Sequence, residues 1–489
     1  MGRGIAQLAA LAGERVLLHD ANPGAASAAL AGVAADLAKL EAKGKLAAGQ
    51  AAAATAKLEI APDLAALAGC WLVVEAIVEK LEAKQALFTS LEGVVGDDCI
   101  LASNTSTLEI GAIAAACRHP GRVAGFHFFN PVPLMKVVEV VDGALTAPSV
   151  TEALADLARR MGHRPVRAKD SPGFIVNHAG RGYGPEALRI VGEGIASFRD
   201  IDAILREGAG FRMGPFELYD LVGLDISHAV MDSMYLQYYQ EPRYRPSPLT
   251  GARVRAGLIG RKTGNGFFRY EDGKQVAPPL APALPAVDLR RPVWVSARGL
   301  GGRLRPLIEK IGAALETSAK PSADALCLVA PLGSDATTAA LAEGLDAART
   351  LAVDALFPLE RRRTLMTTPV TRPELRDAAQ ALLASDGVPV TVIHDSPGFV
   401  TQRVLAHIVN VASDIAQQRV ASPDDIDAAV KLGLGYPLGP LAWGDALGPD
   451  RILAILEGLL AFYGEPRYRP SPWLKRRALL GVSLLTPEG

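Results

Sequence analysis

Two residues, His127 and Glu139, are the strongest candidates for chemistry in this sequence of 489 residues. His127 lies near the end of an apolar run that predicts a buried strand, and Glu139 lies in a second apolar run beyond a Pro-rich turn. A buried carboxylate needs a partner, and a neighbouring imidazole would gain a fixed tautomer and a more stable protonated form. The pair could act as a general base and the group that orients it. The residues alone fit a hydrogen-bonded histidine on a buried β-hairpin equally well.

A polar segment, Leu101–Ile110, follows another predicted strand. Its Ser-Asn-Thr-Ser-Thr run includes Ser106 and suits contact with a phosphate, an amide or a substrate carbonyl. The same hydroxyl residues stand before Glu109, which also matches a helix capping pattern, and capping is the more common use of such residues.

Three charged residues allow two interpretations each. Glu75 and Lys80 lie at the end of a predicted strand, where they could reach a ribose or only face solvent. Lys262 lies in the glycine-rich segment GRKTGNGFF, where it could approach a cofactor or simply belong to a turn.

The first twenty residues match the second part of a dinucleotide-binding unit. Such a unit contains a strand, a G-x-G-x-x-G turn, a helix and a second strand that ends near a ribose-binding carboxylate. Gly2 fits the last glycine, Arg15–Leu18 the second strand and Asp20 the carboxylate. Because the chain starts inside this motif, we expect either a truncated start or a coincidental match. A truncated start would weaken dinucleotide binding relative to a chain extended by the strand and GAGT.

Composition narrows the class of protein. A net charge of -1 with 21% charged residues gives no electrostatic bias toward nucleic acid or an anionic membrane. Four widely separated cysteines suggest neither a disulfide framework nor a metal site, and they fit a reducing cytoplasm. Because every segment falls short of the roughly 18 uncharged residues that span a bilayer, we expect no signal peptide and no membrane helix.

Alternating apolar runs and helical patterns predict an α/β sheet of mostly parallel strands up to residue 168. The expected strands are Arg15–His19, Trp71–Ala76, Ile100–Ser103, Val123–Phe128 and Val137–Val141. Long helical patterns follow, including Ala187–Ala196 and Pro215–Tyr239. The segment Val276–Val287 predicts a Pro-rich linker, and beyond it weak α/β character returns, with Cys327–Pro331 as a possible strand.

Two sequence repeats show that the helical region occurs twice. KDSPGFIVN at Lys169–Asn177 is echoed by HDSPGFVTQ at His394–Gln402. EPRYRPSP at Glu241–Pro248 recurs at Glu465–Pro472. The number of residues between the two copies is nearly the same for both motifs, and it differs by only one residue. Two matches at nearly one offset indicate an internal duplication.

The offset between the DSPGF motifs also compares the candidate site with its copy. It places Gln402 at the position of Asn177 and Ala352 at the position of His127. We therefore predict that the second copy has no base and serves a structural role.

Together the motifs MGRGIAQ, EAIVEK, ASNTSTLEI, FHFFNPVPLMKVVEV, DSPGFIVN and GRKTGNGFF, in this order, resemble the L-3-hydroxyacyl-CoA dehydrogenase family. The resemblance is strongest to bacterial 3-hydroxybutyryl-CoA and 3-hydroxyadipyl-CoA dehydrogenases with a duplicated C-terminal domain. It implies NAD-dependent oxidation of an (S)-3-hydroxyacyl-CoA to a 3-oxoacyl-CoA, in fatty-acid or aromatic-acid catabolism. The alternatives are another two-domain hydroxy-acid or sugar dehydrogenase, and a catalytically silent acyl-CoA-binding or scaffold protein.

The resemblance also implies a domain order. Residues 1–168 would form an N-terminally truncated Rossmann-type NAD-binding domain and residues 169–275 an all-α C-terminal domain. Residues 276–391 would contain the linker and a degenerate α/β module, and residues 392–489 a second all-α repeat. In the family the helical domain builds the subunit interface, so the protein is expected either to form a homo-oligomer or to replace that contact by its internal repeat.

The family's functional residues can be carried onto matching positions. His127 would be the general base, Glu139 would orient it, and Ser106 and Asn177 would position substrate and cofactor. The residues that would contact NAD are Gly2, Asp20, Glu75, Lys80, Ser106, Asn130 and Lys262. Lys43, together with Ser106, would contact the CoA substrate, and no metal is implied.

Overall fold

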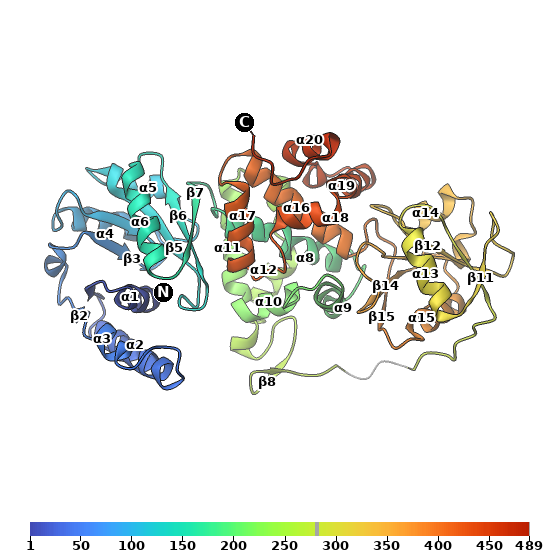
Figure 1. Ribbon diagram of the computed structural model, residues 1–489, viewed down its shortest axis with the longest axis horizontal. Coiled ribbons are helices and arrows are strands. Elements are labelled where there is room, and N and C mark those ends of the chain that lie inside the picture. The colour runs from blue at the N-terminus through green and yellow to red at the C-terminus, as the bar shows by residue number, and fades with distance from the viewer. Residues whose placement is uncertain (279–282, 489) are drawn as a thin grey trace. The chain divides into compact units, whose positions relative to one another are not determined.

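The computed structural model describes residues 1–278 and 283–488, which form two compact units (Figure 1). Unit 1 comprises residues 1–178 and 418–434, and unit 2 the remaining described residues. No helix in these described ranges is long and apolar enough to cross a bilayer. The predicted linker Val276–Val287 includes residues 279–282, which lie outside the described residues. The domain boundaries expected at 168, 275 and 391 stay predictions.

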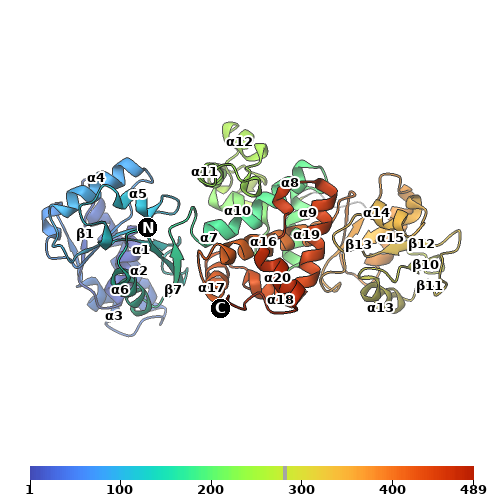
Figure 2. The same cartoon turned by 90° about the horizontal axis from the view of Figure 1, so that it is seen from above.

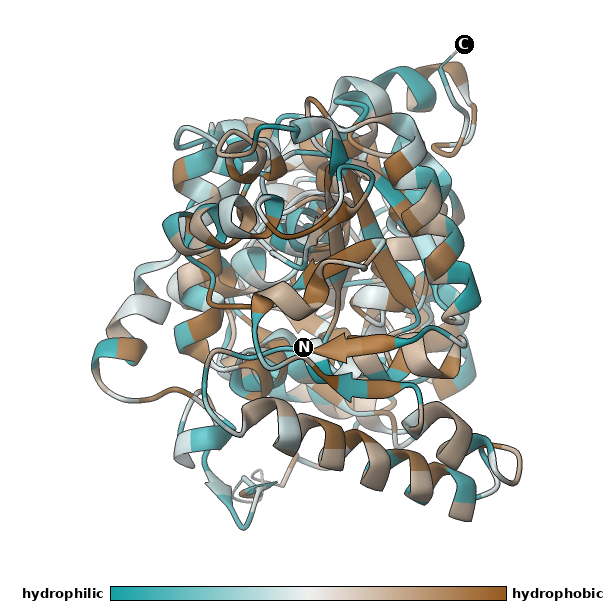
Figure 3. Ribbon diagram, turned by 90° about the vertical axis from the view of Figure 1, so that its left-hand side faces the viewer, coloured by the Kyte–Doolittle hydropathy of each residue, from teal (hydrophilic) through white to brown (hydrophobic). Residues whose placement is uncertain are grey.

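A five-stranded sheet forms the centre of unit 1, in the order β3-β4-β5-β6-β7. Its strands are β3 (Leu72–Glu75), β4 (Ile100–Ser103), β5 (Val123–Phe128), β6 (Val137–Asp142) and β7 (Arg164–Lys169). Neighbouring strands are parallel except β5 and β6, which are antiparallel. All residues of β4 and β5 are buried, as expected for strands covered on both faces. Figure 3 shows this apolar character as brown arrows.

Helices cover both faces of this sheet (Figure 2). Apolar side chains of α1 (Gly2–Leu11) and α6 (Pro148–Arg160) share one core cluster with the strands. Helices α4 (Leu81–Glu92) and α5 (Ile110–Ala114) lie on the opposite face. The sheet and its helices form a Rossmann-type layered arrangement.

The second strand of the predicted dinucleotide-binding unit belongs to a separate sheet. β1 (Val16–Leu18) pairs in parallel with β2 (Leu58–Ile60), beside α2 (Ala25–Ala42) and α3 (Gln50–Thr55). Among the described residues no strand pairs with both β1 and β3. The five strands expected in this region are confirmed. β2 and β7 were missed because charged side chains interrupt both, Glu59 in β2 and two arginines and a lysine in β7.

A helix from the second half of the chain completes unit 1. Helix α17 (Pro423–Gly433) packs against β6 and β7. Just before it, the carbonyl of Val420 accepts a hydrogen bond of 2.8 Å from the amide of Lys169. Asp425 in its first turn lies 3.6 Å from the Arg164 guanidinium. The last strand of the sheet is thus covered by the second helical repeat.

Unit 2 contains most of both helical repeats. The first repeat includes α8 (Gly184–Gly192), α9 (Phe198–Ala203), α10 (Pro215–Val222), α11 (Leu224–Gln237) and α12 (Pro248–Arg255). The second includes α16 (Thr401–Gln417), α18 (Pro440–Leu447), α19 (Pro449–Tyr463) and α20 (Pro472–Leu480). The prediction of one helical stretch over Pro215–Tyr239 is wrong, because Gly223 at φ 99° separates α10 from α11.

A second α/β module, also in unit 2, has the strand order β11-β10-β12-β13-β14-β15. Its strands are β10 (Pro292–Val295), β11 (Ala314–Glu316), β12 (Leu326–Val329), β13 (Thr350–Val353), β14 (Arg363–Met366) and β15 (Val390–Ile393). Its helices are α13 (Gly301–Ile311), α14 (Ala336–Ala342) and α15 (Pro373–Ala384). Only the pair β13 and β14 is antiparallel. This is the pairing pattern of the first module, which confirms α/β character here.

The position equivalent to His127 in this module is Asp354, so the prediction of Ala352 is wrong. In the first module Glu139 pairs with Val166. The separation of the two DSPGF motifs makes Thr391 the counterpart of Val166 in the second module. Thr391 pairs there with Thr364, which therefore occupies the position of Glu139. The residue opposite Thr364 is Asp354, whose amide donates to the Thr364 carbonyl. The connection between β13 and β14 is shorter than the connection between β5 and β6. The separation of the DSPGF motifs therefore does not identify the counterparts of β5 residues on β13.

Candidate active site

His127 and Glu139 face each other across the antiparallel pair β5 and β6. His127 Nδ1 lies 2.5 Å from Glu139 Oε2, and both side chains are buried, with Glu139 fully enclosed. The other carboxylate oxygen accepts hydrogen bonds of 2.9 Å from the amides of Ile175 and Val176. Glu139 is therefore held from two sides and fixes the imidazole.

This contact assigns the roles of the two ring nitrogens. Because a carboxylate accepts, Nδ1 of His127 carries the hydrogen that Glu139 binds. Nε2 is then the nitrogen that can exchange a proton with a substrate. The ring is further held by Phe129, with ring centres 4.5 Å apart, and by Phe174 at 6.0 Å.

The Ser106 segment lies at the end of β4 and is tied to both β5 and Asn177. Asn104 Oδ1 accepts from the amide of Phe128, the residue after His127, at 2.9 Å. Asn177 Nδ2 donates to the Ser106 carbonyl at 3.2 Å. The structure thus brings Ser106 and Asn177 into direct contact and links their segment to the strand that carries His127.

Glu79 holds this segment, and sequence reasoning missed it. Its Oε1 accepts from Thr105 Oγ1 at 2.7 Å and from the amides of Ser106 and Thr107 at 2.8 and 3.1 Å. Burial acts to raise the pKa of Glu79, but these hydrogen bonds and the ammonium of Lys84 outweigh it, so the pKa lies below its ordinary value. The carboxylate therefore stays ionised and keeps the loop in one conformation.

Lys84 is a second residue that sequence reasoning missed. Its side chain is 1% exposed, and Nζ lies 2.8 and 2.9 Å from the two oxygens of Glu75 and 3.3 Å from Glu79. Ser103 Oγ also donates to Glu75. The carboxylate of Glu75 is thus satisfied inside the protein, while Lys80 is exposed beside it. The signal was available, because EAIVEKLEAK contains two further glutamates, Glu79 and Glu82, and a second lysine, Lys84.

The helix capping pattern expected before α5 is wrong. Glu109 occupies the N-cap position, but its side chain makes no capping hydrogen bond. Asp170 supplies the cap from the DSPGF motif, accepting from the amides of Ile110 and Gly111 at 2.8 and 2.7 Å. The hydroxyl residues of the Ser106 segment therefore do not cap α5, although Thr105 Oγ1 accepts from the Leu108 amide at 3.0 Å within the segment. Asp170 links this segment to the motif that holds Glu139.

The other predicted contacts lie in three places. Gly2 is the first residue of α1, and the exposed Asp20 follows β1, where it accepts from the Asn22 amide at 2.8 Å. Asn130 is exposed in the loop after β5, and Lys43 is exposed at the end of α2. Lys262 belongs to unit 2 and forms a 2.6 Å ion pair with Asp225.

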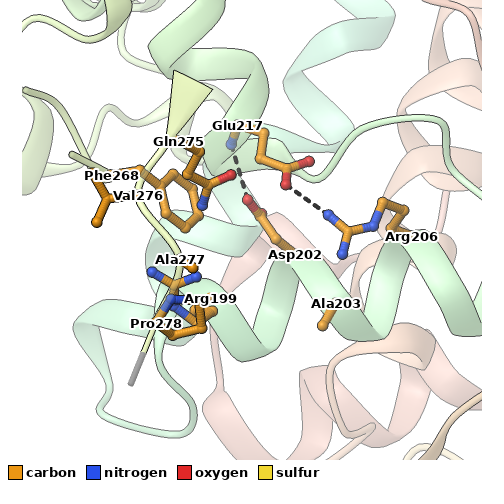
Figure 4. Close-up of a pocket in the computed structure, with 10 residues that line it drawn as sticks. All are labelled: Arg199, Asp202, Ala203, Arg206, Glu217, Phe268, Gln275, Val276, Ala277 and Pro278. Carbon is orange, nitrogen blue, oxygen red and sulfur yellow. Dashed lines mark hydrogen bonds and ion pairs between the residues drawn. The ribbon is translucent and has the colours of Figure 1, made fainter. Parts of the chain in front are cut away.

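A separate pocket of about 200 Å³ lies in unit 2 (Figure 4). Asp202 points into it and accepts from the amides of Phe216 and Glu217, while Arg206 pairs with Glu217 at 2.6 Å. Burial raises the pKa of Asp202 to about 8. None of the predicted site residues lines this pocket, and its charged groups serve mainly to fix the start of α10.

Comparison with known proteins extends these observations. The family described as "3-hydroxyacyl-CoA dehydrogenase, NAD binding domain" matches residues 1–171, and its C-terminal domain matches residues 173–270 and 398–483. The chain is 39% identical to 3-hydroxyadipyl-CoA dehydrogenase of Escherichia coli, over 98% of this chain and 96% of the relative. It is 41% identical to the mitochondrial hydroxyacyl-coenzyme A dehydrogenase of Sus scrofa, over 55% of this chain and 88% of that protein.

Solved structures agree with these sequence matches. The crystal structure of 3-hydroxybutyryl-CoA dehydrogenase from Escherichia coli has a TM-score of 0.86 and 38% identity, and the match covers 98% of this chain and 96% of that one. The (S)-3-hydroxybutyryl-CoA dehydrogenase from Ralstonia eutropha has a TM-score of 0.54 and 37% identity, covering 56% of this chain and 96% of that one. The family's NAD-binding and C-terminal domains are both present, and the chain therefore belongs to the 3-hydroxyacyl-CoA dehydrogenase family.

Proposed function

We propose that this chain oxidises the 3-hydroxyl group of an (S)-3-hydroxyacyl-CoA to a ketone. The observation that carries the proposal is the buried pair His127–Glu139, in which Nδ1 is fixed and Nε2 is left for proton transfer. When bound, NAD supplies the acceptor for the hydride that leaves C3. The hydroxyl proton passes to Nε2 of His127, so the C3–H and O–H bonds break while a C=O double bond forms.

Glu139 supports this step in two ways. It keeps the imidazole in the tautomer with Nδ1–H, and it stabilises the positive charge that develops on the ring. Its own position is set by the amides of Ile175 and Val176. Ser106 and Asn177, which contact each other, would position the substrate against the base.

The first module offers a suitable place for NAD at the ends of its strands. A Cβ on Gly4 would come 2.7 Å from Val132 Cβ, so the start of α1 lies directly against the loop that carries Asn130. Asp20 lies at the carboxyl end of β1, where a carboxylate accepts from ribose hydroxyls and disfavours a 2′-phosphate. We propose Gly2, Asp20, Ser106 and Asn130 as contacts of the cofactor. Glu75, Lys80 and Lys262 stay predicted contacts.

Lys43 marks a proposed contact for CoA. An open groove of about 900 Å³, lined largely by alanines of α2 and α3, lies beside the turn that Lys43 begins. The exposed ammonium of Lys43 suits a phosphate of the CoA nucleotide.

We propose a short-chain or dicarboxylic acyl group, because the two Escherichia coli proteins described above are named for 3-hydroxyadipyl-CoA and 3-hydroxybutyryl-CoA. Following the absorbance of NADH with acetoacetyl-CoA or 3-oxoadipyl-CoA tests the activity in the reverse direction. Loss of absorbance is expected with at least one substrate. Binding of both CoA esters without any loss would instead support the silent acyl-CoA-binding protein.

We also propose that the internal repeat replaces a contact between subunits. In unit 1 the Lys169 amide donates to the Val420 carbonyl, and in unit 2 the His394 amide donates to the Ile195 carbonyl at 2.9 Å. The separation of the DSPGF motifs makes His394 the counterpart of Lys169, and Val420 the counterpart of Ile195. Each hydrogen bond therefore joins one repeat to the other, and the second bond is the first with the roles of the two repeats exchanged. Such reciprocity is typical of a two-fold interface. Light scattering should give a particle near 51.3 kDa, the mass of one chain; a dimer would contradict the proposal.

A further inference from the structure

The second α/β module contains a strand, a glycine-containing turn and a helix in the order of a dinucleotide-binding unit. β10 leads into Ser296-Ala297-Arg298-Gly299-Leu300-Gly301, and α13 follows. The three glycine positions of G-x-G-x-x-G are thus occupied by Ser296, Arg298 and Gly301. The last glycine keeps its packing role, because a Cβ there would lie 1.8 Å from the Ser296 carbonyl oxygen.

Two backbone amides of this turn, those of Leu300 and Arg298, already donate to groups of the protein. The Leu300 amide donates to the Ala330 carbonyl at 2.8 Å, and the Arg298 amide donates to Ser296 Oγ at 3.0 Å. A Cβ on Gly299 would lie 2.3 Å from the Ala330 oxygen. The turn is therefore pressed onto the end of β12, whereas a pyrophosphate site needs amides that face the ligand.

A carboxylate stands beside the same turn. Ser296 Oγ lies 2.8 and 2.7 Å from the two oxygens of Glu343, and Ser296 is 1% exposed. A pyrophosphate brought to this turn would meet a fixed negative charge at short range, which disfavours it. The second glycine position is also blocked, because Arg298 carries a side chain where the backbone would have to approach the pyrophosphate.

The position for proton transfer is closed as well. Asp354 replaces His127, and Gln402, fully buried, replaces Asn177. Gln402 Nε2 donates to Asp354 Oδ1 at 3.0 Å and to the Pro331 carbonyl at 3.2 Å. Its Oε1 accepts from the Gly333 amide at 2.8 Å. The amide of Gln402 thus bonds both to the strand end and to the loop that corresponds to the Ser106 segment.

We propose that the second α/β module is a sealed copy of the catalytic module, in which protein groups occupy both the nucleotide turn and the proton-transfer position. The chain then binds one dinucleotide and has one catalytic centre. The closure of the second module is argued from contacts within unit 2 alone. The statement that one site remains rests on the proposed function of the first module.

Calorimetric titration of the whole chain with NADH, combined with hydrogen exchange, tests this proposal. We expect one NADH per chain, with protection in residues 1–178 and none in residues 292–366. Two NADH per chain, or protection of residues 296–302, would overturn it. An absence of NADH binding would overturn the proposed function, while agreeing with a sealed second module.

A matched pair of charge substitutions separates the two modules. Asp20→Arg in the first should alter NADH affinity and cofactor preference, because it removes the ribose-binding carboxylate. Arg298→Glu in the second should leave NADH affinity unchanged within about twofold, well below the tenfold change that corresponds to 1.4 kcal/mol. A tenfold loss of affinity or a change of stoichiometry in Arg298→Glu would contradict the sealed module. Hydrogen exchange on the unaltered chain decides the question if that variant does not fold.

Discussion

His127 Nδ1 and Glu139 Oε2 lie 2.5 Å apart on directly opposed residues of two antiparallel strands. The strand register, not a flexible loop, sets this distance, so the imidazole is in place before substrate arrives. This arrangement makes separate predictions for the two members of the pair.

Replacing His127 by glutamine should lower kcat by about 10²–10⁴-fold, the usual effect of removing a positioned base. The amide can still donate to Glu139, so the fold and acyl-CoA binding should be retained. Steady-state kinetics and calorimetry with acetoacetyl-CoA measure both. Near-normal kcat would remove His127 from the proposed mechanism.

Replacing Glu139 by glutamine should lower kcat with little change in KM. The neutral amide no longer offsets the positive charge that develops on the ring as Nε2 takes the hydroxyl proton. Steady-state kinetics with acetoacetyl-CoA measure both constants. A rise in KM with an unchanged kcat would separate Glu139 from the base.

Replacing Glu79 by alanine should raise KM and lower kcat, because the Ser106 segment loses its acceptor for three short hydrogen bonds. We expect a loss of about tenfold in kcat/KM, or about 1.4 kcal/mol, close to the lower end of the range for a hydrogen bond to a charged group. Glu82→Ala, at an exposed position in the first turn of α4, is the control. Equal effects in the two variants would argue against a specific role for Glu79.

Replacing Lys84 by methionine should destabilise the protein by about 3–5 kcal/mol, because the buried Glu75 carboxylate loses its cation. Adding Glu75→Gln should recover much of that loss. Urea unfolding of the single and double variants measures the coupling. If the double variant were as unstable as the sum of the singles, the pair would not be the cause.

Replacing Asp354 by asparagine should stabilise the second module at neutral pH. Burial raises the pKa of Asp354 from 3.8 to about 6. Because the folded pKa lies above the unfolded value, ionisation destabilises the folded wild type as the pH rises from about 4 to 6. The full difference is about 3 kcal/mol at pH 7.5.

Melting temperatures of wild type and Asp354→Asn, measured from pH 7.5 to 4.5, check this expectation. The advantage of the variant should shrink as the pH falls. A difference in melting temperature that stays constant across this range would show that folding does not raise the pKa of Asp354.

The sequence predicted features that are encoded in short stretches of chain better than contacts between distant segments. The strands β3, β4 and β5 were predictable because each is a short apolar run, and the pair His127–Glu139 followed from two adjacent runs. Glu79 was not identified because most groups that donate to it lie in the loop after β4. Lys84 was overlooked although its partners Glu75 and Glu79 lie in its own segment.

The second module shows the same limit. The residue equivalent to His127 was predicted from the constant separation of the DSPGF motifs. The connection between β13 and β14 is shorter than the connection between β5 and β6, so Asp354 takes the place of His127. Only the pairing of the strands could show this. The contact of α17 with β7 was equally hidden, because it joins segments that lie far apart in the chain, as the hydrogen bond from the Arg167 amide to Asp425 shows.

The membership of α17 in unit 1 has a consequence for biosynthesis. A ribosome releases residues 1–178 long before residues 418–434, so the sheet emerges with β7 uncovered and waits for most of the chain to be made. An unpaired, uncovered strand edge is prone to wrong association, and pairing across such a distance slows folding. The nascent chain therefore has the longest exposure at β6 and β7, the strands that carry and flank Glu139.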